Sequence, residues 1–69
     1  MNNTQREVLF RANKGDSYRW YFGRVDGKYC WWSHTQGPKT SYRFVDTETE
    51  LLNLVEWFRS KGFSVTEAQ

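Results

Sequence analysis

The side chains that could perform acid–base or nucleophilic chemistry are few in this chain and are not grouped. His34 is the only histidine, and it directly follows Ser33. Adjacent residues on an extended strand point to opposite faces, so these two side chains cannot act as a nucleophile and its base. Most of the carboxylates fall in expected turns or in the first turn of an expected helix, where capping explains them. We therefore expect a protein that is not an enzyme.

The sequence also lacks the residue patterns that metal or cofactor binding needs. Cys30 is the only cysteine, so no intramolecular disulfide and no zinc site with two thiolates can form. The glycines form no phosphate-binding motif, and turns, close packing or a helix cap explain each of them. We expect no metal site, no cofactor, and a small buried thiol at Cys30.

The chemistry that the sequence favours is binding through aromatic rings and cations. Seven aromatic side chains lie within the fifteen residues from Tyr18 to Trp32, interspersed with Arg19, Arg24 and Lys28. Nucleic-acid bases stack on such rings for roughly 1–3 kcal/mol each, while Arg and Lys neutralise phosphate. This pattern predicts a small, non-catalytic nucleic-acid-binding domain, with DNA or RNA as its partner.

The charges are distributed unevenly along the chain. Residues 6–45 contain eight Lys and Arg against three acids, a net charge of +5, whereas residues 46–69 contain two against five, a net charge of −3. A basic half joined to an acidic half indicates a one-sided electrostatic surface for an anionic partner.

Length and composition predict one small domain. A chain of 69 residues has room for a single marginal core, and its aromatic content of 19% supplies large side chains to fill that core. We expect a domain over residues 6–65, with flexible ends at 1–5 and 66–69. A single cysteine and no long apolar stretch favour a cytoplasmic protein that does not enter a membrane.

The elements expected to position these residues are short strands followed by one helix. Strands are predicted at 6–12, 17–25, 28–35 and 41–45, with a loop at 36–40 and a short edge strand as one possibility for 63–65. Asp26-Gly27 predicts a two-residue hairpin turn, because both residues tolerate the positive φ that a type I′ turn needs. The predicted fold class is α+β, an antiparallel β-meander of three to four strands packed against one C-terminal α-helix.

The ends of the helix are marked by capping residues. Thr47 with Glu50 predicts a capping box at its start, and Gly62 predicts a left-handed cap just after Lys61. The apolar residues between these ends recur at helical spacing and should form the stripe that faces the core. This stripe comprises Leu51, Leu54, Val55 and Phe58.

The hairpin register divides the sheet into two faces. A two-residue turn pairs Val25 with Lys28, and strict alternation then places Gly23 and Cys30 on one face with Ala12. Since small residues allow a helix to approach closely, we expect the helix on that face. The opposite face becomes the candidate nucleic-acid-binding surface. It comprises Arg11, Tyr18, Trp20, Phe22, Arg24, Tyr29, Trp31 and Arg43.

Two alternatives remain open at this stage. A one-residue bulge would exchange the two faces, and the functional surface would then lie around Arg19, Tyr21, Lys28, Trp32 and His34. The aromatic face could also serve a protein-interaction module, either a homodimer or a small inhibitor of a larger protein, because Trp, Tyr and Arg are enriched at protein interfaces. Phosphate binding weakens steeply with salt, which separates the two functions.

Overall fold

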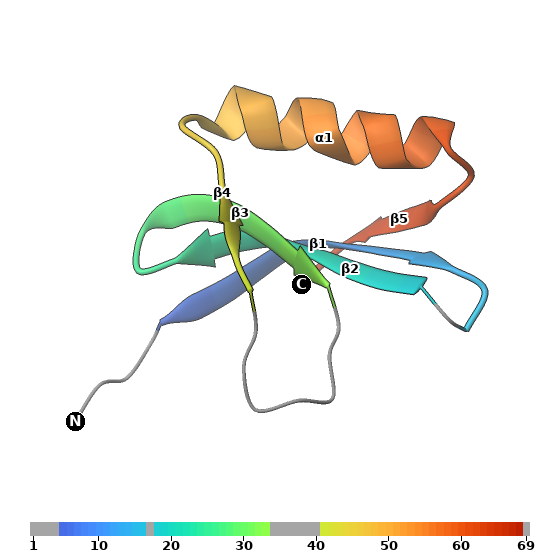
Figure 1. The fold of residues 1–69 in the computed structure, drawn as a ribbon, viewed down its shortest axis with the longest axis horizontal. Helices are drawn as coiled ribbons and strands as arrows, with labels where there is room; N and C mark the ends of the chain where they lie inside the picture. Colours follow the sequence, from blue (N-terminus) through green and yellow to red (C-terminus); the bar gives the residue numbers. More distant parts are fainter. Residues whose placement is uncertain (1–4, 17, 34–40, 69) are drawn as a thin grey trace.

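The fold is a five-stranded antiparallel sheet with one helix packed on it (Figure 1). The computed structural model describes residues 5–16, 18–33 and 41–68. Its elements in chain order are β1 (Arg6–Lys14), β2 (Tyr18–Val25), β3 (Lys28–Ser33), β4 (Arg43–Phe44), α1 (Glu48–Ser60) and β5 (Ser64–Glu67). The predicted fold class, a small α+β domain with an antiparallel sheet and one helix near its C-terminal end, is confirmed.

The strand order is β4-β3-β2-β1-β5, so four consecutive strands form a meander and the chain then crosses to the far edge. The helix α1 makes this crossing, and β5 pairs antiparallel with β1 (Figure 1). The sheet therefore has one strand more than the three to four predicted. β5 also continues through Thr66 and Glu67, so pairing extends beyond the predicted domain boundary at Val65.

The central hairpin has the predicted turn and register. Asp26 has φ 52° and Gly27 has φ 82°, which are the positive values that a type I′ turn requires. Val25 pairs with Lys28, and Phe22 pairs with Trp31. No bulge interrupts the pairing of β2 with β3.

The helix begins and ends at the predicted residues. The Thr47 hydroxyl oxygen accepts a hydrogen bond from the backbone N–H of Glu50 at 3.2 Å. At the other end Gly62 has φ 94°, and the N–H of Phe63 donates to the carbonyl of Phe58 at 3.2 Å. The Phe58 and Phe63 rings meet 5.0 Å apart, which completes a Schellman cap.

The prediction of which sheet face the helix covers is wrong. The main core is formed by Ala12 and Phe22 of the sheet with Leu51, Val55 and Phe58 of α1. Phe22 is completely buried, and Trp20 and Trp31 pack against the same core. The helix thus covers the face that was expected to be open. Of the predicted helical stripe, Leu54 alone is only partly buried.

The physical reason for this choice is ring packing against the helix. Phe58 lies 5.6 Å from Trp20, 5.1 Å from Phe22 and 5.7 Å from Trp31, measured between ring centroids. A helix on the opposite side of the sheet would leave these three rings of β2 and β3 uncovered. Burial of large aromatic area outweighs close backbone approach.

A β-bulge in β1 adjusts the outer strand to this arrangement. The pairing with β2 shifts between Val8 and Phe10, which leaves Leu9 as the extra residue. Phe10 therefore packs in the main core although Val8 does not. Gly23 allows close approach of β1 rather than of the helix, because a Cβ at Gly23 would lie 1.8 Å from the carbonyl oxygen of Glu7.

Candidate nucleic-acid interface

The side of the sheet opposite α1, here called the distal face, is the surface that the helix leaves uncovered (Figure 1). Strand pairing and alternation assign its residues, because directly paired residues of antiparallel strands point to the same side. On β1 to β4 and the residue before β4, they are Arg6, Val8, Arg11, Asn13, Arg19, Tyr21, Gly23, Val25, Lys28, Cys30, Trp32, Tyr42 and Phe44. β5 adds Ser64 and Thr66.

Most of the predicted site residues lie on the helix side instead. Phe22 is buried, so its ring has no surface for a base. Trp20, Tyr29 and Trp31 are half-buried and pack against the main core. Arg43 is exposed but lies over two of these rings, with its guanidinium carbon 5.6 Å from Trp20 and 5.2 Å from Trp31.

Arg11 is the predicted site residue that the structure places on the distal face, where it pairs with Tyr21. Tyr18 begins β2 opposite Lys14, and its side chain lies outside the described part of the chain. His34, named with the alternative surface, also falls outside the described residues.

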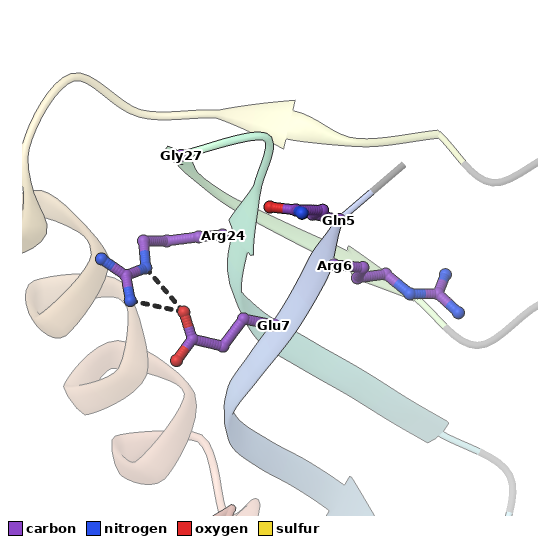
Figure 2. A pocket seen from close by; sticks show the side chains of 5 residues that line it. All are labelled: Gln5, Arg6, Glu7, Arg24 and Gly27. Carbon is purple, nitrogen blue, oxygen red and sulfur yellow. Dashed lines mark hydrogen bonds and ion pairs between the residues drawn. The ribbon is translucent and has the colours of Figure 1, made fainter. Parts of the chain in front are cut away.

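Arg24 is engaged in an ion pair on the helix side. Figure 2 shows its guanidinium and the Glu7 carboxylate directed toward each other, while Arg6 extends to the other side of the strand. The Arg24 Nε donates to Glu7 Oε1 at 2.9 Å, and Nη2 donates to the same oxygen. This hydrogen bond and the negative charge of Glu7 raise the pKa of the Arg24 guanidinium. Arg24 is thus already occupied by an acid.

The distal face contains a small apolar cluster of its own. Val25, Cys30 and Trp32 are buried, with Trp32 only 3% exposed. Tyr21 stacks beside Trp32 at 5.9 Å, the ring of Tyr42 meets it edge-on at 5.3 Å, and the Arg6 guanidinium lies over it at 5.7 Å. Burial raises the pKa of the Cys30 thiol, because the thiolate would lose its hydration there.

Tyr42 and Arg6 are connected across this cluster. The Arg6 Nη1 donates a hydrogen bond to the Tyr42 hydroxyl at 3.1 Å. The Arg6 and Tyr42 side chains therefore cover Trp32 on its outer side. The hydrogen bond keeps the positive charge of Arg6 at the surface of the distal face.

Four cations among the described residues occupy the distal face. Arg6, Arg11, Arg19 and Lys28 are all exposed, and the strand positions that share this face in the described segments carry no acid. No ion pair joins Arg11, Arg19 or Lys28 to a described carboxylate. By contrast, residues 46–62 around the helix carry four acids and two bases, a net charge of −2. The segment around α1 and the distal face thus differ in the sign of their charge.

A shallow depression of about 320 Å³ lies among the cations at one end of the distal face. It is lined by Arg11, Ala12, Asn13, Arg19, Trp20 and Tyr21. Arg11 pairs with Tyr21, and Asn13 pairs with Arg19, so the two guanidinium groups come from neighbouring strands. This arrangement can place two positive charges and an amide around one anion.

Two further recesses lie elsewhere on the molecule. One of about 540 Å³, lined by Gln5, Arg6, Glu7, Arg24 and Gly27, contains the Arg24–Glu7 ion pair (Figure 2). The other, of about 490 Å³, lies between α1 and the neighbouring strands. It is lined by Trp31, Val45, Glu50, Asn53, Leu54 and Trp57. Neither brings unpaired cations together.

Sequence reasoning missed Arg6, Tyr42 and Phe44 as surface residues of the candidate interface. Tyr42 and Phe44 fall within the segment 41–45 that was predicted as a strand, but they were not among the predicted site residues. Arg19, Tyr21 and Lys28, which were named for the case in which the faces are exchanged, lie on the distal face. The helix covers the other face than predicted although the central hairpin contains no bulge. No local sequence signal indicates which of two apolar faces a helix covers.

Comparison with protein-family models, with curated proteins and with solved structures finds no match to this chain. Its class is therefore defined by its own structure, a small α+β domain with a basic and aromatic sheet face. The helix α1, the one helix of the described segments, is too short and too polar to cross a membrane.

Proposed function

We propose that the protein is a non-catalytic nucleic-acid-binding domain and that the distal face is its binding surface. The observation that carries this proposal is the gathering of four exposed cations around partly exposed aromatic rings on a face whose described strand positions carry no acid. Unpaired Arg and Lys on one face create a field that attracts phosphate, and rings between them offer contact to bases.

The acidic residues around α1 also favour the distal face as the side that meets a nucleic acid. The acids Asp46, Glu48, Glu50 and Glu56 lie around α1, on the opposite layer from the distal face. A polyanion is repelled from that layer and attracted to the distal face, so the whole field orients the protein toward it.

Titration against labelled single-stranded and duplex DNA and RNA over a salt series tests this function. We expect binding at low salt whose affinity falls steeply as salt rises, because each phosphate contact releases a counterion. Arg19→Ala should reduce the salt slope by about one phosphate contact.

Arg24→Ala is the matched control, because it removes the same charge from the helix side, where Glu7 already pairs with it. Its salt slope should remain that of the parent. If the parent binds none of the four nucleic acids at low salt, nucleic-acid binding is wrong and the protein-interaction module becomes the better proposal.

A further inference from the structure

We infer that the distal face binds nucleic acid in single-stranded form, with Phe44 as a ring on which an unpaired base stacks. This inference rests on the proposed function and specifies its ligand. It is carried by the arrangement of the rings, which is independent of the charges.

Four rings form a row across the distal face. Phe44 lies 6.4 Å from Tyr42, Tyr42 lies 5.3 Å from Trp32, and Trp32 lies 5.9 Å from Tyr21, all between ring centroids. The row runs from the outer strand β4 through β3 to β2. It thus crosses the strands rather than following one of them.

The rings of this row have different exposures and therefore different roles. Trp32 is buried, so it supports its neighbours and offers no face to a ligand. Tyr21 and Tyr42 are half-buried. Phe44 is 55% exposed, although its ring belongs to a residue type that is usually buried. The exposed part of the Phe44 ring is therefore open to stacking by a base.

The row leads directly to the exposed cations Arg11 and Arg19. Tyr21, at its inner end, pairs across the strands with Arg11, and Arg19 lies two residues from Tyr21 on β2. A nucleic-acid strand that lies along the row can therefore stack bases near Phe44 and Tyr42 while its phosphates reach the depression at Arg11 and Arg19.

This geometry favours an unpaired strand over a duplex. In a duplex the faces of the bases are stacked on one another and only their edges are presented in the grooves. An apolar ring such as Phe44 would then gain little, whereas in a single strand each base offers a π-face to it.

The test compares the same nucleotide sequence as a single strand and as a duplex. A labelled oligothymidylate about 12 nucleotides long, its RNA counterpart and the duplex formed with the complementary strand are titrated at equal salt. We expect the single strands to bind at least about 10-fold more tightly than the duplex, a difference within the range that base stacking provides. The DNA and RNA arms show whether the 2′-hydroxyl changes the affinity.

Two variants of one residue then test the ring. Phe44→Leu keeps an apolar side chain but removes the ring, and it should lower single-strand affinity about 10-fold without changing the salt slope. Phe44→Tyr keeps the ring and should retain the affinity of the parent. Thermal melts of both variants establish that they are folded.

The outcomes separate this inference from the proposed function. If the parent binds neither single strand nor duplex, the proposed function itself is wrong. If it binds duplex as tightly as single strand with a salt slope that depends on Arg19, the function stands and the single-strand inference is overturned. Equal affinities of Phe44→Leu and the parent would also overturn it.

Discussion

The two faces of the sheet bury aromatic rings by different means. On the helix side, Phe22 is enclosed by α1 and its ring contacts Phe58. On the distal face, Trp32 is almost as buried, yet two tyrosine rings and the Arg6 guanidinium supply its described cover. Burial of a large ring therefore does not identify the face on which a helix packs.

Charge distinguishes the faces better than apolar content does. On the helix side, Arg24 pairs with Glu7, Arg59 pairs with Glu56, and Lys14 donates to the carbonyl of Lys61 at 3.2 Å. On the distal face, Arg11 and Arg19 are exposed and pair with no described acid. The three cations named on the helix side already bond to groups of the protein itself. Arg11 and Arg19 on the distal face remain available to a ligand.

The largest expected effect is the loss of Phe22 from the helix side. Phe22→Ala should cost about 3–5 kcal/mol of unfolding free energy, since a completely buried ring is replaced by a cavity. For a domain of this size that is comparable to the whole stability. Urea or thermal denaturation measures it, and a variant that melts close to the parent would contradict the assignment of the main core.

The next effect tests whether the distal cluster is packed as a core. Trp32→Ala should cost about 3 kcal/mol, because its ring is buried although no described helix covers it. Tyr42→Phe is the control, since it removes the hydroxyl that accepts from Arg6 but keeps the ring, and it should be much milder. A tryptophan truncation that costs less than about 1 kcal/mol would mean that the distal cover is too loose to count as packing.

The smallest effect is a difference in pH dependence between the parent and Cys30→Ala. Burial raises the pKa of the folded thiol above its ordinary value of 9.0, so the unfolded chain loses this proton first as pH rises. The contribution of the protonated thiol is fully present below the unfolded pKa and is lost as pH rises through the folded value. Urea denaturation between neutral and alkaline pH should show a steeper fall for the parent. Parallel curves would indicate that Cys30 is not desolvated.

The features that sequence predicted are those that a few neighbouring residues determine. Asp26-Gly27 fixes the hairpin turn and with it the register of β2 and β3, because few residues accept two successive positive φ values. Thr47 and Gly62 likewise determine the ends of α1 through local hydrogen bonds. Each of these signals is complete within a few residues.

The features that sequence did not predict depend on distant residues. The helix-covered face follows from how Phe58 packs among rings of β2 and β3, and alternation alone treats both faces equally. No Gly, Pro or Asn marks the bulge at Leu9 in the sequence. The pairing of Arg24 with Glu7 depends on the strand register beside that bulge. For these reasons most of the predicted site residues lie on the side that the helix covers.

The pairing of β1 with β5 joins segments that are distant in sequence, and this has a consequence for how the molecule folds. The hairpin of β2 and β3 closes a two-residue turn, so it can form early, whereas β5 can add to β1 only after the intervening chain has been ordered. We therefore expect this edge, with its high contact order, to form late in folding. The high contact order also makes β5 the segment whose local opening would expose the backbone groups of β1 that bond to it to hydrogen exchange before the rest of the sheet.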